Sequence, residues 1–451
     1  MQPKHTTFLL VGIIIVLAAI LVGMLVYVRN QPVQPRTFQP LVEIQPMEPD
    51  SSVWGINFPN QWNSFQKTAA NNIATTYGGS SQLSWLERDP RQLILFKGMP
   101  FSRDYNEDRG HANSLIDLRH TKRLNLNPED PKRSPGTCYS CKTADAPRLW
   151  AEMGTTEFYK TFFGDLGQQV NHPVGCANCH EAGTMRLIVT NPALEEALQA
   201  QGKDWTTFSR QEMRSIVCAN CHVEYYFEGP GRYLVFPWSR GTTVEEMWEY
   251  YENELVNGEK FADWVYPDTQ TRMIKVQHPE YELFTASSTH YNAGLACADC
   301  HMPYVRDGAA KYSSHDVKSP LLMPELSCGQ CHSDVQYVVR RVNLIQDQVY
   351  NTKIAAEDAI VDAINALAAA SANPNADPAL LEQARLLHRR AHFYWDFISA
   401  ENSMGFHNPE YALKILAEAT NFARQAQMLA AQAVNDVSLL KTGTFYQQGN
   451  P

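Results

Sequence analysis

The ten cysteines of the chain form five Cys-x-x-Cys pairs and leave none over. The pairs are Cys138/Cys141, Cys176/Cys179, Cys218/Cys221, Cys297/Cys300 and Cys328/Cys331. Four pairs are followed at once by a histidine, at His180, His222, His301 and His332, whereas the first is followed by Lys142. In Cys-x-x-Cys-His, each thiol can form a thioether with a haem vinyl group, and the adjacent histidine reaches the iron as an axial ligand.

Other uses of cysteine fit this pattern less well. A zinc site would use two pairs per metal and would leave one pair stranded. A disulfide framework would not require a histidine after the second cysteine of four pairs. The sequence therefore predicts five covalently attached haem c groups.

The histidine supply matches this prediction. Of 14 histidines, four lie inside the motifs, and His5 precedes the apolar N-terminal run. Four more would complete four haems with two histidine ligands, which have no vacant position and can only pass electrons. The nine candidates are His111, His120, His172, His278, His290, His315, His388, His392 and His407.

Lys142 makes the first haem site chemically unlike the other four. A lysine amine ligates iron only when it is deprotonated, so the metal must strongly lower its pKa. In the alternative interpretation Lys142 is a surface charge, and this haem takes both ligands from elsewhere. Either way, an odd site among repeats is where catalysis is expected.

The elements that position these motifs differ along the chain. Between Arg133 and His332 the sequence is rich in Gly, Pro and Asn and has no long amphipathic pattern, which is typical of a core filled by cofactors. Helical spacing then predicts a long helix over 335–372. Asp377-Pro378 and Asn408-Pro409 read as helix starts, for helices to about Ile398 and Asn435. We predict a mainly α fold: a loop-rich multihaem core, long C-terminal helices and very little β structure.

The N-terminus suggests a membrane location. The run from Phe8 to Val28 has 21 residues and no charge, enough to cross a bilayer core of about 30 Å, and no small-residue cleavage signal follows it. We expect an uncleaved anchor, with a cleaved signal peptide as the alternative. The predicted domains are an anchor (1–30), a proline-containing linker (31–50), a five-haem core (51–334) and a long-helix region (335–451). The net charge of −10 argues against nucleic acid as a partner.

Beyond the cysteines, five stretches carry a resemblance to a known family. They are Phe101-Ser102-Arg103-Asp104-Tyr105, Arg109-Gly110-His111, His222 to Phe227, Lys275 to Pro279, and Asn402 to His407. With one Cys-x-x-Cys-Lys motif followed by four Cys-x-x-Cys-His motifs, the chain closely resembles the pentahaem, ammonia-forming cytochrome c nitrite reductases from Trp54 to the third C-terminal helix.

The resemblance implies roles for individual residues. The distal haem ligands would be His111, His290, His315 and His407, for haems three, five, two and four. Arg123, Tyr225 and His278 would line the substrate pocket at the Lys142 haem, with Arg119 and Lys122 as competitors for the arginine position. One calcium ion would be held by the side chains of Glu224 and Gln277 and the carbonyls of Tyr225 and Lys275. His120, His172, His388 and His392 would then need no metal role.

The implied activity is the six-electron reduction of nitrite to ammonia. Lys142 would be the σ-donor ligand of an open iron, Arg123 and His278 would supply positive charge, and Tyr225 would supply a hydroxyl donor. The alternatives are an electron conduit without catalysis, or a related reductase of hydroxylamine or sulfite. The resemblance also implies a homodimer through the C-terminal helices and a multihaem quinol-oxidising donor, with a membrane tetrahaem type favoured. Since haem c is attached outside the cytoplasmic membrane, the expected location is its periplasmic face.

Overall fold

The structure, a computed structural model, describes residues 4–30, 39–130, 133–256 and 258–447. The chain divides into two units, Met1–Leu41 and Val42–Pro451. The first unit contains one helix, α1 (Lys4–Asn30). Among the described residues, no helix combines the length and apolar character needed to cross a membrane. The predicted membrane anchor at Phe8–Val28 is therefore not supported.

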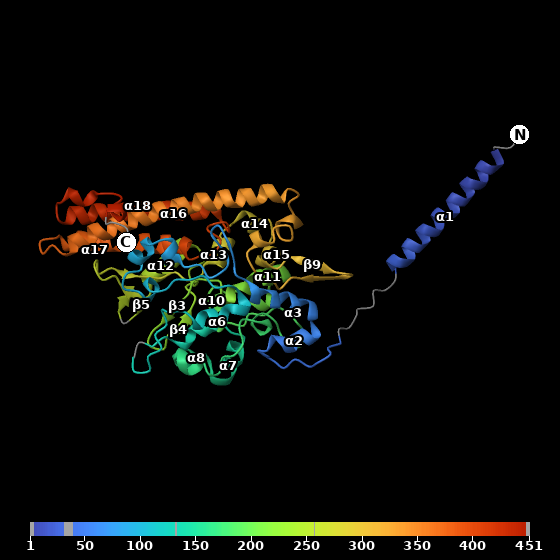
Figure 1. The fold of residues 1–451 in the computed structure, drawn as a ribbon, viewed down its shortest axis with the longest axis horizontal. Helices are drawn as coiled ribbons and strands as arrows, with labels where there is room; N and C mark the ends of the chain where they lie inside the picture. Colours follow the sequence, from blue (N-terminus) through green and yellow to red (C-terminus); the bar gives the residue numbers. More distant parts are fainter. Residues whose placement is uncertain (1–3, 31–38, 131–132, 257, 448–451) are drawn as a thin grey trace. The chain divides into compact units, whose positions relative to one another are not determined.

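The second unit is mainly helical, as predicted (Figure 1). Three long helices, α16 (Val335–Ser371), α17 (Pro378–Ser399) and α18 (Pro409–Ala433), pack against one another at its C-terminal end. The remaining α-helices are short. They are α2 (Ser51–Asn57), α3 (Pro59–Gln66), α4 (Trp85–Arg88), α5 (Arg91–Leu95), α6 (Ser114–Arg119), α7 (Ala146–Met153), α8 (Thr155–Lys160), α9 (Phe163–Leu166), α10 (Pro192–Ala200), α11 (Arg210–Ile216), α12 (Val244–Asn253), α13 (Glu280–Thr285), α14 (Thr289–Asn292), α15 (Cys297–His301) and α19 (Thr444–Gln447).

The strands of the described residues form five separate antiparallel hairpins. The pairs are β1 (Ile73–Thr75) with β2 (Gly78–Ser80), β3 (Tyr226–Glu228) with β4 (Tyr233–Val235), β5 (Leu255–Val256) with β6 (Glu259–Lys260), β7 (Trp264–Val265) with β8 (Arg272–Met273), and β9 (Tyr304–Asp307) with β10 (Ala310–Ser313). Since no hairpin extends into a larger sheet in this part of the chain, strands contribute little to the core.

The long helices begin where the sequence predicts. The Asp377 side chain accepts hydrogen bonds from the backbone N–H groups of Ala379 and Leu380, which caps α17. The Asn408 side chain accepts from the N–H of Tyr411 and caps α18 in the same way. The predicted helix starts are thus confirmed, and the ends of α16, α17 and α18 agree with prediction within two residues.

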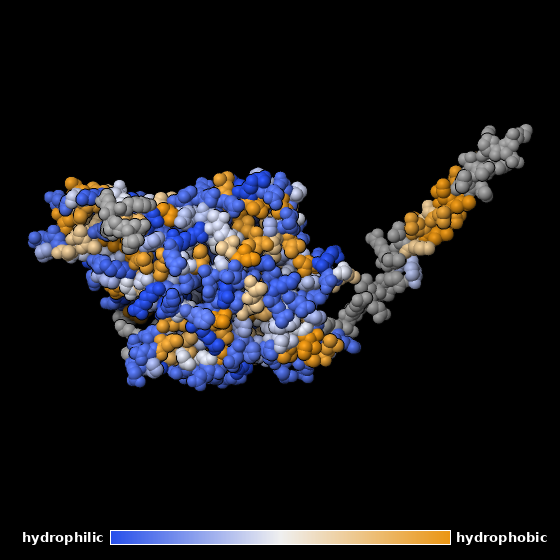
Figure 2. Space-filling view, viewed as in Figure 1, coloured by the Kyte–Doolittle hydropathy of each residue, from blue (hydrophilic) through white to orange (hydrophobic). Residues whose placement is uncertain are grey.

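The interior of the second unit is apolar and strongly aromatic. Alanine-rich faces let α16, α17 and α18 approach closely, and Trp395, Phe393 and Phe397 of α17 are fully buried. On the face drawn in Figure 2, most of the surface of this unit is hydrophilic, with scattered apolar patches. Burying a large apolar side chain, as α17 does with Phe393 and Phe397, stabilises the fold by about 1.5–3 kcal/mol each. These helices therefore give the loop-rich part of the chain a rigid support.

Candidate functional site

Each Cys-x-x-Cys pair lies on a short helical turn. Four turns are single 3-10 segments: Gly136–Cys141, Cys176–Asn178, Cys218–Asn220 and Cys328–Gln330; the fifth is α15. In three histidine motifs, the histidine N–H donates to the carbonyl of the first cysteine, at 2.9–3.0 Å. The N–H of Lys142 instead donates to the carbonyl of Tyr139, at 3.1 Å. The lysine motif therefore differs in its backbone turn as well as in its last residue.

Two pairs of predicted axial histidines face each other across a gap of the right size. The ring centroids of His180 and His315 are 6.3 Å apart, and those of His301 and His407 are also 6.3 Å apart. A metal–imidazole bond is about 2 Å long and the ring adds roughly 1 Å on each side, so two imidazoles sharing one metal have centroids about 6 Å apart. Both pairs therefore fit one iron between them.

In each of the other two predicted pairs, the two histidines lie within electrostatic reach of each other. Burial, followed by the charge of His222, lowers the pKa of His111 to about 4. Burial, followed by the charge of His332, lowers the pKa of His290. His111 and His290 are thus neutral at pH 7, which is the form that binds metals.

The second ring nitrogens of these histidines have partners of their own. The Nδ1 atoms of His180, His301 and His315 lie 3.0, 3.2 and 2.9 Å from the carbonyl oxygens of Met185, Lys318 and Ser313. Nδ1 of His407 lies 3.2 Å from the Glu401 carboxylate. Such contacts fix the tautomer and leave Nε2 free for a metal. With all ten cysteines as free thiols, the residues present fit covalently attached haem.

The His407 loop is held against α16 by a glycine. Gly405 has φ +75°, and a Cβ atom there would lie 2.8 Å from Cγ1 of Val349. A larger residue would be strained at this φ and would force the Val349 side chain of α16 to shift. The glycine therefore allows the loop that carries His407 to approach α16 closely.

Lys142 points at a carboxylate that the sequence analysis did not single out. Its ammonium group donates to Oδ2 of Asp108. Burial acts to lower the pKa of Lys142, but the Asp108 carboxylate outweighs it, so the pKa lies above its usual value. Iron would therefore have to displace a proton from Lys142 in order to bind it.

The predicted pocket residues gather around the same motif. Burial raises the pKa of the Cys138 thiol to about 11, and the Arg123 guanidinium opposes this rise. Burial also raises the pKa of Tyr225 well above its usual range; Cys141 and Cys138 add to the effect, and Arg123 opposes it. Arg123 and Tyr225 thus lie within electrostatic reach of the first cysteine pair.

The competing arginine is engaged elsewhere. Nη2 of Arg119 donates to the carbonyl oxygens of Val170, at 2.6 Å, and Gly167, at 3.2 Å. Those contacts tie Arg119 to a loop about 50 residues further along the chain. The geometry favours Arg123 for the pocket.

His278 belongs to the same cluster but is not a fixed cation. Burial lowers its pKa to about 4, although Glu280 opposes this shift. Nδ1 of His278 lies 4.0 Å from Oε1 of Glu280, and Nδ1 of His222 lies 3.5 Å from Oε2 of the same carboxylate. At neutral pH His278 is therefore an N–H donor, whereas the sequence analysis gave it a positive charge. Glu280, which that analysis missed, joins the pocket to the third haem motif.

Three of the four predicted calcium ligands are in mutual contact. Oε2 of Glu224 accepts from the N–H of Gln277 at 2.6 Å, and the Gln277 amide donates to the carbonyl of Lys275 at 3.1 Å. Burial raises the pKa of Glu224 well above its usual value, so a bound cation would offset a real desolvation cost. Within the described residues, no group of three or more His, Cys, Asp or Glu side chains forms a metal site. The predicted calcium set holds a single carboxylate and is of a different kind.

Two of the remaining histidines serve the packing. His388 and His392 are fully buried on α17, and the His392 ring packs edge-on against Phe96, Trp264 and Trp395. Nδ1 of His388 lies 3.0 Å from Oγ1 of Thr271. Their i, i+4 spacing therefore reflects an aromatic core.

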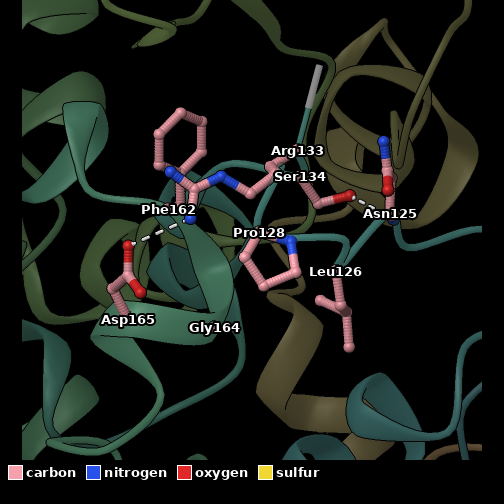
Figure 3. Close-up of a pocket in the computed structure, with 8 residues that line it drawn as sticks. All are labelled: Asn125, Leu126, Pro128, Arg133, Ser134, Phe162, Gly164 and Asp165. Atoms are coloured by element: carbon pink, nitrogen blue, oxygen red, sulfur yellow. Dashed lines mark hydrogen bonds and ion pairs between the residues drawn. The ribbon is translucent and has the colours of Figure 1, made fainter. Parts of the chain in front are cut away.

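A surface pocket of about 220 Å³ is lined by residues on both sides of the first motif in sequence, among them Ser134 before it and Phe162 after it (Figure 3). The Arg133 guanidinium stacks over the Phe162 ring at 3.7 Å and lies 3.5 Å from Asp165. The backbone N–H of Asn125 donates to Oγ of Ser134. None of the predicted pocket residues lines it, so the cavity is separate from the cluster at Cys138.

Comparison with known proteins agrees with this architecture. The family model described as cytochrome c552 matches residues 50–446. A cytochrome c-552 of Parabacteroides distasonis is 37% identical over 394 residues, which cover 87% of this chain and 78% of the relative. The cytochrome c nitrite reductase subunit NrfA of Nitratidesulfovibrio vulgaris is 38% identical over 413 residues, which cover 85% of this chain and 78% of that protein.

A solved structure has the same fold. It is the catalytic subunit, NrfA, of the cytochrome c nitrite reductase of Desulfovibrio desulfuricans, a protein with two calcium sites. The sequence identity is 34%, the TM-score is 0.83, and the match covers 92% of this chain and 90% of the other. The chain belongs to the cytochrome c552 family.

Proposed function

We propose that this protein reduces nitrite to ammonia with six electrons, at a haem c attached to Cys138 and Cys141. One observation supports the proposal. Arg123, Tyr225 and Lys142, from three separate segments, lie within electrostatic reach of this cysteine pair, and His278, from a fourth, lies within reach of Lys142. Relatives at 34–38% identity include two cytochrome c nitrite reductase subunits.

When bound, the haems supply electron storage and transfer, and the first supplies an iron with an open position for nitrite. Lys142 would bind the iron of this first haem. The pairs His180/His315, His222/His111, His301/His407 and His332/His290 would hold the other four haems. Cys176, Cys179, Cys218, Cys221, Cys297, Cys300, Cys328 and Cys331 would attach them.

The pocket residues divide the remaining work. The Arg123 guanidinium attracts the anion and donates hydrogen bonds to its oxygens. His278, as a neutral imidazole, donates an N–H to the departing oxygen and relays protons. The Tyr225 hydroxyl is a second donor, and burial keeps it protonated.

We further propose a calcium ion at Glu224, Tyr225, Lys275 and Gln277. Glu224 and Tyr225 are adjacent in sequence, and Gln277 precedes His278. A cation bound by these oxygens would rigidify both segments that supply pocket residues. It would also add positive charge beside the anion site.

The protein is proposed to act outside the cytoplasm, because haem c is attached there. Its donor would be a quinol-oxidising multihaem cytochrome, with a membrane tetrahaem type favoured. The helices α16 to α18 are the proposed homodimer interface.

The decisive experiment measures ammonia formed from nitrite with a reduced viologen dye and the purified five-haem protein. We expect about six electrons consumed per ammonia, and one high-spin haem signal that shifts when nitrite is added. A spectrum with only low-spin haem and no ammonia would instead identify an electron conduit. Turnover of hydroxylamine or sulfite without turnover of nitrite would assign a different substrate.

A further inference from the structure

Asp108 is held in place by the anchored residues on either side of it. Glu107 accepts a hydrogen bond from the Trp85 indole N–H at 2.5 Å. The backbone N–H of Arg109 donates to Oδ2 of the buried Asp117 at 3.0 Å, and the Arg109 guanidinium pairs with the same carboxylate at 2.6 Å. Asp108 therefore has little freedom, and its carboxylate contacts Lys142.

Lys142 is fixed from its own side. Its N–H donates to the carbonyl of Tyr139 at 3.1 Å, and its carbonyl accepts from the Ser114 hydroxyl at 2.9 Å. The side chain is partly enclosed, with 24% of its surface accessible, against 30% for Asp108. The contact between the amine and the carboxylate thus joins two rigid backbone segments.

We propose that Asp108 is a positioning residue that orients the Lys142 amine toward the haem iron and increases its electron donation. The inference rests on the proposed function, in which Lys142 is the axial ligand. A primary amine that gives its lone pair to a metal keeps two N–H bonds, and Asp108 stands where it accepts one of them. Carboxylates that accept from metal-bound histidines raise ligand basicity in the same way.

The charge arrangement supports this assignment. A carboxylate near an anion pocket opposes the binding of nitrite unless a neighbouring cation balances its charge. Asp108 is within the electrostatic reach of Lys142, His278 and Arg123, and Lys142 acts on it most strongly. Lys142 therefore balances most of the negative charge of Asp108, and Arg123 stays available to bind the substrate.

The test variant replaces the Asp108 carboxylate with an amide of nearly the same shape. We expect Asp108→Asn to retain five haems by mass and the low-spin signals of the other four. The midpoint potential of the high-spin haem should rise, because a weaker donor ligand favours the ferrous state. The kcat for nitrite should fall about tenfold, the low end of the range for outer-shell partners of metal ligands. KM should change less than twofold, and Asp108→Glu should recover part of kcat.

Glu107→Gln is the matched control. It removes the charge of the neighbouring carboxylate, keeps a side-chain oxygen that can accept from the Trp85 indole N–H, and leaves the Asp108 carboxylate on Lys142. Burial raises the pKa of Glu107 to about 7, so the comparison is made at pH 8.5, where the wild-type side chain is ionised. A potential and a kcat that change equally in both variants would overturn the proposal in favour of a long-range charge effect.

Failure of this inference is distinct from failure of the proposed function. A wild-type protein that reduces nitrite at a high-spin haem, with an Asp108→Asn variant of unchanged potential and kcat, would reject only the role of Asp108. A wild-type protein without a high-spin haem would reject Lys142 as the ligand beside an open position, and the role of Asp108 with it.

Discussion

The guanidinium of Arg123 and the ammonium of Lys275 both lie over the ring of Phe101, at 4.4 and 5.0 Å from its centroid. The two cations come from segments 152 positions apart in the sequence. Lys275 is three residues from His278, so Phe101 sets the position of Arg123 relative to the second pocket segment. A cation over an aromatic face gains about 0.5–2 kcal/mol, depending on burial.

Replacing the Phe101 ring should therefore loosen the anion site. We expect Phe101→Leu to raise the KM for nitrite about threefold to tenfold, because Arg123 loses a cation–π contact of that size. Steady-state kinetics with a reduced viologen dye would measure it. Phe101→Tyr keeps the ring face and should remain within twofold of wild type. Equal KM values for the Leu and Tyr variants would show that the ring does not position Arg123.

We expect Arg123 to contribute far more to nitrite turnover than Arg119 does. Arg123→Ala should lower kcat/KM for nitrite about 100-fold, since loss of one preorganised donor costs about 10²–10³ in rate. Arg119→Ala is the control, because its guanidinium bonds to the carbonyls of Gly167 and Val170. Its kcat/KM should stay within about threefold of wild type. The reverse order of effects would assign Arg119 to the pocket.

The segment from Lys275 to His278 is also held in place by a residue of α17. The Asp396 carboxylate accepts from the Lys275 ammonium at 2.9 Å and from the N–H of Val276 at 2.9 Å, and both side chains are almost completely buried. Asp396→Leu would leave a buried ammonium unpaired, which costs about 3–5 kcal/mol of unfolding free energy. Urea unfolding followed by tryptophan fluorescence would measure the loss.

The same pair offers its own control. Asp396→Leu combined with Lys275→Met removes both charges, and such replacements are often neutral. The double variant should recover most of the lost stability while keeping the Lys275 carbonyl available to calcium. A double variant as unstable as the single one would show that the N–H of Val276 is the contact that counts.

Features that depend on residues close together in the sequence could be predicted, and contacts between distant segments could not. The caps at Asp377 and Asn408 and the Cys-x-x-Cys spacing are local, so the long helices and attachment sites could be placed before the fold was known. The contact of Lys142 with Asp108 spans 34 positions and that of Lys275 with Asp396 spans 121. No local pattern encodes such pairings, because they arise only when separate segments pack. For the same reason, the sequence could not give the neutral state of His278, which depends on burial.

Stability should depend on pH through His388, which is fully buried on α17. Burial lowers its pKa from 6.5 to about 3. Between these values the unfolded chain binds a proton that the folded chain does not, so stability falls as the pH drops below about 6.5 and is complete above it. At pH 5 the difference amounts to about 2 kcal/mol, at 1.36 kcal/mol per pH unit. Urea unfolding of His388→Gln between pH 7.5 and pH 5 should therefore show a loss about 2 kcal/mol smaller than that of wild type. His120→Gln, at an exposed position, should keep the full wild-type dependence, and a His388 variant that also keeps it would show that this ring is not held neutral by burial.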